Sequence, residues 1–212
     1  MPADHDSVRR SYDALAERYS ARLGDELAHK PLDRALLAAL LEQMPAATPV
    51  ADLGCGPGHV AAWLAACGAR AVGIDMSPGM VAVGQREHPE VEFRQGDLRA
   101  LPASDGEFGA AVALYSIIHL DTDELGPALR EARRVLVPGG RLLLAFHVGD
   151  EVRHVDEMWG EGVDLDFRFL DPGQVVHILD GAGFDTEARL ERTNYPEEVE
   201  TRRAYLQARR RG

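Results

Sequence analysis

Three closely spaced glycines follow a short apolar segment that carries one carboxylate. The segment is Val50–Leu53 with Asp52 inside it, and Gly54, Gly56 and Gly58 follow. Glycines let a ligand approach the backbone, and free N–H groups at the start of the next helix can point at that ligand. Such a turn at the carboxyl end of a parallel strand is where open α/β sheets bind nucleotide-like ligands. Because similar turns also occur without a ligand, this stretch predicts a site but does not identify its occupant.

Two more carboxylates stand at the ends of segments with strand character. Asp75 closes Ala71–Asp75, about twenty residues beyond the glycine turn, and an acid there can accept hydrogen bonds from ribose hydroxyls. Asp97 follows the alternating segment Val91–Gln95. Asp75 could instead cap the next helix, and Asp97 could close a turn. Pro57, between the second and third glycines, argues against a plain dinucleotide fingerprint.

Two histidines lie at the ends of predicted central strands. His119 follows Phe108–Leu114, and His147 ends the segment Arg141–His147. Because the pKa of histidine lies near neutrality, either imidazole could accept a proton from a substrate, and we favour His119 as this base. Packing or local hydrogen bonding is the alternative explanation.

Residue types that bind metals are present, but their spacing does not suit a metal site. One loose group follows the fifth predicted strand and comprises His147, Asp150, Glu151 and His154. Because the group lies in a loop without a metal motif, we expect no metal. Cys55 and Cys67 likewise lack the spacing of a metal site or a disulfide framework, and we interpret both as packing residues.

Composition limits the classes of partner. The 212 residues carry a formal net charge of −12, which argues against a nucleic-acid backbone as partner. A cluster of arginines near the end is interpreted as a solvated last strand and tail: Arg202, Arg203, Arg209, Arg210 and Arg211. The polar start is unlike a signal peptide, and no apolar run has the length of a membrane span. We therefore expect a cytoplasmic protein without a membrane partner.

A predicted helix over residues 7–20 precedes the first strand. Its spacing places four apolar or aromatic side chains on one face: Val8, Tyr12, Leu15 and Tyr19. Because of its place in the chain, this helix could cover the glycine crevice as a lid. Packing of both tyrosines in the core is the alternative.

Strand and helix signals alternate through most of the remaining chain. Strands are predicted over 50–53, 71–75, 91–95, 108–114, 141–147, 183–192 and 201–209, and helices over 32–43, 60–67, 77–86, 123–136 and 172–181. This alternation is typical of a doubly wound parallel α/β sheet. The short connection between the last two strands predicts an antiparallel hairpin.

Residues 148–171 interrupt this rhythm. They are acidic, contain Trp159, and alternate apolar with polar positions at Val163, Leu165, Phe167 and Phe169, which predicts a strand with one apolar face. We interpret the segment as a cap over the substrate. A surface excursion that closes a sheet edge or a dimer contact is the alternative, so a homodimer stays open.

Taken together, five motifs resemble those of the class I S-adenosylmethionine-dependent methyltransferases of the small-molecule, metal-independent type. They are Asp52–Gly58, Asp75–Ser77, Gly96–Leu98, Leu114–Ser116 with His119, and Leu136–Gly140. The resemblance runs from about Tyr12 to the end of the chain. It implies a Rossmann-like, seven-stranded, mostly parallel sheet with helices on both faces, an antiparallel last strand and an N-terminal helical lid.

The resemblance also implies a division of one methyltransferase domain over 1–212. Residues 1–45 would form the N-terminal helices and lid, and 50–147 the cofactor-binding half. Residues 148–171 would form the substrate cap, and 172–212 the C-terminal helix and hairpin.

S-adenosylmethionine is the implied cofactor, with S-adenosylhomocysteine as product. Asp52 would anchor its ammonium, Asp75 its ribose hydroxyls and Asp97 its adenine amino group, while Met76 and Leu98 would enclose the adenine. The full set of implied cofactor-binding residues is Tyr12, Tyr19, Asp52, Gly54, Cys55, Gly56, Asp75, Met76, Asp97, Leu98, Leu114, Tyr115 and Ser116.

The implied reaction is an in-line transfer of a methyl group to an oxygen or nitrogen of a small-molecule acceptor, in which positioning is the main contribution of the protein. We expect the acceptor to contact His147, Trp159, Phe167 and Phe169, with Tyr195 as a further wall. The alternatives are a nicotinamide-dependent oxidoreductase and a non-catalytic module that binds S-adenosylmethionine.

Overall fold

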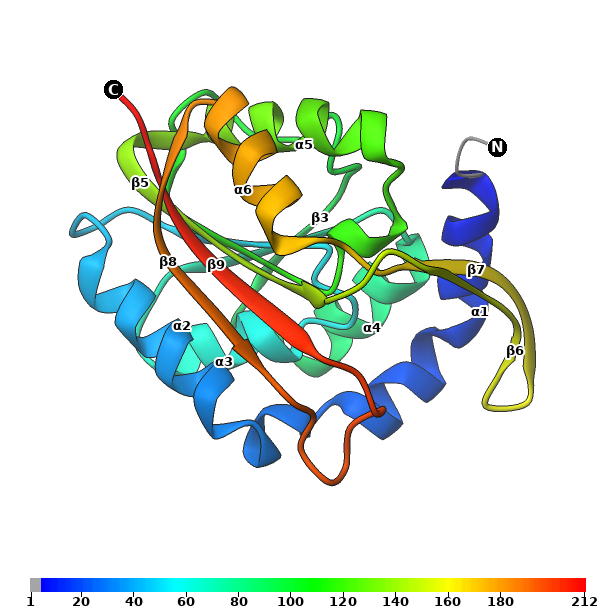
Figure 1. Cartoon of the computed structure of the whole chain (residues 1–212). Coiled ribbons are helices and arrows are strands. Elements are labelled where there is room, and N and C mark those ends of the chain that lie inside the picture. The colour runs from blue at the N-terminus through cyan, green and yellow to red at the C-terminus, as the bar shows by residue number, and fades with distance from the viewer. Residues whose placement is uncertain (1–4) are drawn as a thin grey trace.

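A seven-stranded sheet forms the centre of the computed structural model, which describes residues 5–212. Its strand order is β3-β2-β1-β4-β5-β9-β8 (Figure 1). The strands are β1 Val50–Leu53, β2 Ala71–Asp75, β3 Glu92–Gln95, β4 Phe108–Leu114, β5 Leu136–His147, β8 Phe184–Arg192 and β9 Arg203–Arg210. The first five pair in parallel, whereas β9 is antiparallel to both β5 and β8. The predicted fold class is therefore confirmed, including the antiparallel last strand.

Helices cover both faces of this sheet (Figure 1). They are α2 Pro31–Gln43, α3 His59–Ala66 and α4 Pro78–Glu87 on one face, and α5 Thr122–Val135 and α6 Pro172–Gly181 on the other. Strand β4 is apolar throughout because both of its faces are buried. In β4, Val112 packs with the first group of helices, and Ala111 and Ala113 pack with the second.

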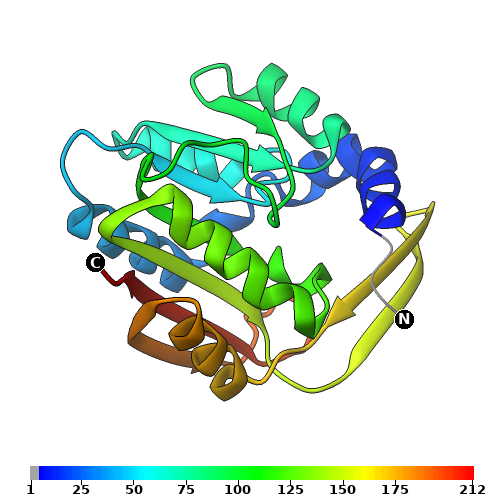
Figure 2. The ribbon, with the colours of Figure 1, turned by 90° about the horizontal axis from the view of Figure 1, so that it is seen from above.

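The N-terminal helix α1, His5–Leu23, packs against a hairpin that is separate from the main sheet. The hairpin consists of β6 Val152–Met158 and β7 Glu161–Arg168, and Figure 2 shows it beside α1 at one edge of the molecule. Val8 and Leu15 of α1 form a buried cluster with Leu165 of β7. The predicted alternation of the 163–169 segment is thus correct, because Leu165 is fully buried.

The middle of α1 is also joined to the main body by polar contacts. Ser77 Oγ donates a hydrogen bond to Asp13 Oδ1 at 2.6 Å, and the Gly79 N–H donates to the same oxygen at 3.0 Å. Because Ser77 and Gly79 begin α4 directly after β2, this contact holds the predicted lid at the carboxyl edge of the sheet.

Some local predictions were wrong. Strand β6 was not predicted because most of its side chains are exposed and lack an apolar alternation. Strand β5 begins at Leu136 instead of Arg141, with a register shift against β4 that accommodates the expected turn. Cys67 is exposed rather than packed, and Arg203 is buried rather than solvated.

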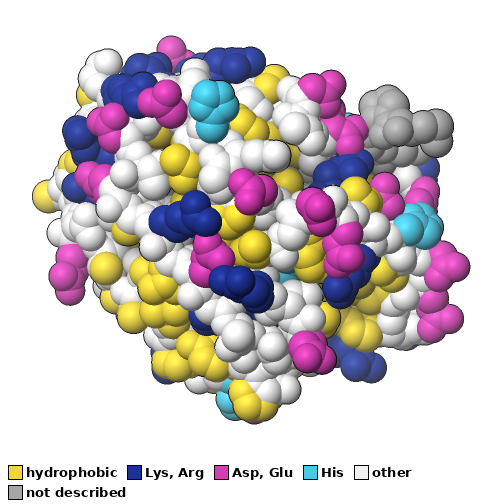
Figure 3. Space-filling model, viewed as in Figure 1, with side chains coloured by type: hydrophobic (Ala, Val, Ile, Leu, Met, Phe, Trp, Pro, Cys, Tyr) yellow, Lys and Arg dark blue, Asp and Glu magenta, His cyan; other side chains and the backbone are white. Residues whose placement is uncertain are grey.

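Two short 3-10 turns complete the elements near the sheet edge: η1 Glu26–His29 and η2 Ile117–His119. On the face in Figure 3, acidic and basic side chains are interspersed. Among the described residues, no helix has the length and apolar character needed to cross a membrane.

Candidate functional site

A cavity of about 440 Å³ lies at the carboxyl edge of the parallel strands. Strands β1, β2, β4 and β5 supply its floor, and α1, η1 and the loop between β8 and β9 supply its cover. It brings together all but one of the predicted site residues: Tyr12, Tyr19, Asp52, Gly54, Cys55, Gly56, Asp75, Met76, Asp97, Leu98, Leu114, Tyr115, Ser116, His119, His147, Trp159 and Phe167.

The exception is Phe169, which was expected to contact the acceptor. Its ring stacks on His147, with ring centroids 5.4 Å apart, and Arg153 covers it. Phe169 therefore supports a cavity wall from behind. The alternating pattern of the segment identified its buried face but could not distinguish a lining residue from a supporting one.

The glycine turn is shaped by its contacts with neighbouring strands. Gly54 has φ +72°, and a Cβ there would lie 2.3 Å from the Cβ of Ser116. Gly58 has φ +89°, and a Cβ there would lie 2.3 Å from the Phe93 ring. Side chains at these two positions would therefore strain the backbone and displace the ends of β3 and β4.

Asp75 is buried and holds the glycine turn to the start of α4. Its Oδ2 accepts a hydrogen bond from the Gly56 N–H at 2.8 Å, and its Oδ1 accepts from the Ser77 N–H at 2.9 Å. Burial nevertheless raises its pKa to about 6. Asp75 is not the helix cap, because the Ser77 side chain occupies that position and accepts from the Met80 N–H.

Asp52 is a second buried carboxylate in the same wall. It accepts a hydrogen bond from the Ala61 N–H at 3.1 Å, and burial raises its pKa to about 7. The nearby Asp75 adds a smaller upward contribution. A cationic group in the cavity would favour the ionised form of both carboxylates and lower both pKa values.

Asp97 differs because it has a cationic partner. Its Oδ2 lies 2.6 Å from Arg99 Nη2, and its Oδ1 accepts from the Arg99 N–H at 2.8 Å, which closes a local turn. Burial opposes ionisation, but the hydrogen bonds from Arg99 outweigh it and lower the pKa of Asp97. Since its side chain stays 32% exposed, this ionised carboxylate can also accept a hydrogen bond in the cavity.

His119 is engaged at both nitrogens. Its Nδ1 lies 3.0 Å from the Asp166 carbonyl oxygen and its Nε2 lies 2.7 Å from Tyr12 Oη. Because a carbonyl only accepts, Nδ1 carries the proton and Nε2 accepts from the tyrosine hydroxyl. Burial lowers the pKa of His119 to about 4, contrary to the expected value near neutrality. The predicted base is therefore hydrogen-bonded to the lid.

His147 lies at the end of β5 between two aromatic rings. Its ring centroid is 5.0 Å from that of Tyr115, and its Nδ1 lies 2.9 Å from Thr201 Oγ1. Burial, together with the nearby Arg203 and Lys30, lowers its pKa to about 4. His147 is therefore neutral at physiological pH.

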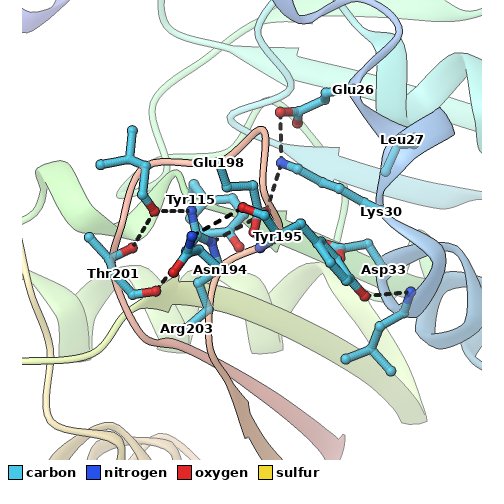
Figure 4. Close-up of polar contacts among 12 residues, drawn as sticks. Glu26, Leu27, Lys30, Asp33, Tyr115, Asn194, Tyr195, Glu198, Thr201 and Arg203 are labelled. Carbon is cyan, nitrogen blue, oxygen red and sulfur yellow. Dashed lines mark hydrogen bonds and ion pairs between the residues drawn. The ribbon is translucent and has the colours of Figure 1, made fainter.

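An ionic cluster beside the cavity was not predicted (Figure 4). Lys30 Nζ lies 2.7 Å from Glu26 Oε2 and 3.7 Å from Glu198 Oε1, which connects η1 to the loop between β8 and β9. Arg203 adds a contact of 3.3 Å with Glu198. Glu26 and Lys30 are four residues apart, whereas Lys30 and Glu198 are far apart in the sequence, so no local pattern could have paired the latter two.

A buried polar network supports the neighbouring wall. The hydroxyl of Tyr205 donates to Asp33 at 3.0 Å and lies 3.4 Å from the Tyr115 hydroxyl, while Arg192 pairs with Asp33 at 3.3 Å. Tyr115 has φ 58°, an uncommon conformation for a residue with a side chain. Such backbone strain concentrates at functional sites, and here the strained residue lines the cavity.

No group of three or more His, Cys, Asp or Glu side chains in residues 5–212 is arranged to hold a metal ion. In particular, His154 pairs with Asp166 on the exposed face of the hairpin.

Comparisons with known proteins agree with this geometry. Residues 50–140 match the family described as a methyltransferase domain. The demethylmenaquinone methyltransferase of Beutenbergia cavernae is 35% identical over 147 residues, which cover 68% of this chain and 60% of that protein. The chain spans 54–60% of the length of the first three curated relatives that it matches.

Solved structures share the whole fold at low sequence identity. The 1,6-didemethyltoxoflavin-N1-methyltransferase of Burkholderia thailandensis has a TM-score of 0.75 at 20% identity, covering 100% of this chain and 92% of that one. The [4+2]-cyclase SpnF has a TM-score of 0.70 at 22% identity, covering 100% and 98%. At these identities the likeness concerns the fold alone.

Proposed function

We propose that this chain, which carries a class I S-adenosylmethionine-dependent methyltransferase domain, transfers the methyl group of that cofactor to an oxygen or nitrogen of a small-molecule acceptor. The observation that carries the proposal is the row of three carboxylates, Asp52, Asp75 and Asp97, in one cavity beside a glycine turn. Asp52 and Asp75 are buried, and among the described residues their hydrogen-bond partners are backbone N–H groups, none of them cationic.

The donor set in the cavity fits the cofactor. Asp75 retains lone pairs for ribose hydroxyls beside its two backbone hydrogen bonds. Asp97 would accept from the adenine amino group, with Met76 and Leu98 on the two faces of the ring. Asp52 would pair with the ammonium group, which accounts for a buried carboxylate that accepts a single hydrogen bond from residues 5–212.

When bound, S-adenosylmethionine supplies a methyl group already activated by the positively charged sulfur. The protein therefore has to orient the acceptor and exclude water, and orientation alone can contribute about 7–11 kcal/mol to lowering a barrier. Helix α1 and the β6–β7 hairpin provide the cover, and Tyr12 and Tyr19 lie on its inner side. The strained Tyr115 and the adjoining Ser116 form the wall at the end of β4.

The acceptor is proposed to be a neutral or cationic compound with a planar ring. Aromatic rings at Tyr115, His147, Trp159 and Phe167 line the cavity, and Glu198 disfavours an anion. Lys30 and Arg203 do not reverse this preference, because Glu26 and Glu198 already pair with them. The names of the matched methyltransferases support a small-molecule acceptor.

The first test separates cofactor classes. S-adenosylhomocysteine at 100 times its Kd should raise the free energy of unfolding by about 2.7 kcal/mol, measured as a shift in Tm, and NAD should give no shift. A shift with NAD and none with S-adenosylhomocysteine would favour the nicotinamide-dependent alternative.

The second test separates catalysis from binding. The chain is incubated with S-adenosylmethionine and a panel of phenols, aromatic amines and carboxylic acids, and each compound is examined by mass spectrometry for one added methyl group. We expect turnover of phenols or amines. Cofactor binding without any methylated product would favour the non-catalytic alternative, and methylation of carboxylic acids alone would contradict the acceptor class.

A further inference from the structure

The two cavity histidines differ in which nitrogen is available to a ligand. At His119 both nitrogens are occupied, by Tyr12 and by the Asp166 carbonyl. At His147 only Nδ1 has a hydrogen-bond partner among residues 5–212, namely Thr201 Oγ1. His147 lines the cavity, which leaves its Nε2 available to a ligand.

One tautomer of His147 satisfies both contacts of Thr201. Thr201 Oγ1 lies 2.9 Å from His147 Nδ1 and 3.5 Å from the Val199 carbonyl oxygen, so we assign the hydroxyl proton to the Val199 side. The lone pairs of Thr201 Oγ1 then accept from His147 Nδ1–H. This arrangement leaves a lone pair on His147 Nε2, directed away from the threonine.

The ring of His147 is also fixed in place. Phe169 stacks on it at 5.4 Å with an interplanar angle of 29°, and Tyr115 packs at 5.0 Å. In the parallel pairing of β4 and β5, Leu114 lies opposite Ala145, so His147 lies at the carboxyl edge beside Tyr115 and Ser116. This is the wall assigned to the acceptor in the proposed function.

We propose that His147, oriented by Thr201, is the base that takes the proton from a hydroxyl acceptor. This inference rests on the proposed methyl transfer. As the acceptor oxygen forms its bond to the methyl carbon and the carbon–sulfur bond breaks, the electron pair of that bond stays on sulfur and the hydroxyl proton passes to His147 Nε2. The resulting imidazolium releases the proton to water.

The charges around His147 suit this role. Burial together with Arg203, Lys30 and Arg153 disfavours its protonated form and Glu198 partly offsets them, so the imidazole is neutral before the reaction. A weak base is sufficient, because the proton on oxygen becomes strongly acidic once the oxygen bonds to the methyl group. An amine acceptor needs this base less, because the lone pair of the neutral nitrogen attacks the methyl carbon directly and the proton can leave to water after the transfer.

The tautomer is tested directly by nuclear magnetic resonance of the chain labelled with ¹⁵N-histidine. His147→Asn identifies the resonances of His147 by their loss. We expect a protonated Nδ1 and an unprotonated Nε2 at pH 7, and a mixture of both tautomers in Thr201→Val. A protonated Nε2 in the wild-type chain would overturn the proposal, whether or not any acceptor is methylated.

Kinetics test the proton transfer with the acceptors identified by mass spectrometry. The amide of asparagine takes the place of Nδ1, so His147→Asn keeps a donor for Thr201 but removes Nε2. It should lower kcat for a phenol by about 10²- to 10⁴-fold with little change in KM, and kcat for an aromatic amine by far less. His177→Gln, at an exposed site on α6, is the matched control.

Two further results separate this inference from the proposed function. Unchanged affinity for S-adenosylhomocysteine in His147→Asn, measured by calorimetry, would locate the loss in the transfer step. Equal rates of wild type and His147→Asn with a phenol, or an acceptor panel in which only amines or carbon atoms are methylated, would overturn the role of His147 and leave methyl transfer intact.

Discussion

At the residue scale, the same side-chain type behaves differently according to its neighbours. Asp97 is ionised beside Arg99, whereas burial raises the pKa of Asp52 and of Asp75. The spacing of the sequence predicted that these acids lie near one another. It could not predict their ionisation, because ionisation depends on burial and on partners that only the folded chain brings together.

The raised pKa of Asp52, about 7, predicts a proton release on cofactor binding. The ammonium group of S-adenosylhomocysteine favours the ionised carboxylate, so protons leave when the complex forms near pH 6.5 and affinity rises with pH through 7. Calorimetry in buffers of different ionisation enthalpy measures this release. Asp52→Asn should reduce the release to the smaller contribution of Asp75, and an unchanged release in that variant would show that Asp52 does not titrate.

The same pKa predicts the pH dependence of stability. Between about pH 4 and 7, Asp52 keeps its proton in the folded chain but has lost it in the unfolded chain. The free energy of unfolding therefore falls as pH rises through that range. Asp75 contributes in the same direction up to about pH 6, so Asp52→Asn should reduce this slope, most of all above pH 6, in urea titrations at several pH values. The control variant Asp150→Asn, which changes an exposed carboxylate, should keep the pH dependence of the wild-type chain.

At the element scale, the sequence predicted what is local and periodic. The order of strands and helices and the apolar face of β7 follow from hydrophobic patterns and glycine turns, and they agree with the structure. Strand β6 has no such pattern and became a strand by pairing with β7. The contact of Lys30 with Glu198 depends on tertiary structure, so no pattern in the chain could indicate it.

The packing of α1 on the hairpin predicts a local effect of Leu165→Ala. Truncating this fully buried side chain leaves a cavity between the lid and the hairpin, with a cost of about 2–5 kcal/mol if the site cannot collapse. Hydrogen exchange should accelerate in α1 and β7 and stay unchanged in β1 and β4. Val152→Ala, at a residue that is 49% exposed on β6, is the control. Equal acceleration in all four elements would mean that the lid does not open separately.

At the scale of the whole molecule, a buried network joins α2 to the antiparallel strands. Asp33 accepts from the Tyr205 hydroxyl and pairs with Arg192, which connects an N-terminal helix to β8 and β9. The same network reaches the Tyr115 hydroxyl in the cavity wall. The stability of the sheet edge and the shape of the acceptor wall therefore depend on the same residues.

Asp33→Ala should destabilise the entire fold because it leaves the Arg192 charge half-buried with one fewer partner. Removing one partner of a buried ion pair costs about 3–5 kcal/mol, and the remaining contact between Arg192 and Glu198 reduces this toward the lower value. Urea unfolding measures the change. Glu187→Ala removes an exposed partner of Arg209 and should cost less than about 1 kcal/mol. Similar losses in both variants would contradict the importance of the network.

The proposed methyl transfer requires that Asp75 and Asp97 hold the adenosine part of the cofactor. Titration calorimetry with S-adenosylhomocysteine tests it in the wild-type chain and in Asp75→Ala and Asp97→Ala. Each lost hydrogen bond to a charged group corresponds to about 1.5–3 kcal/mol, so the Kd should rise by about 10- to 150-fold in each variant. Wild-type affinity in both variants, with circular dichroism spectra that show an intact fold, would contradict the assignment.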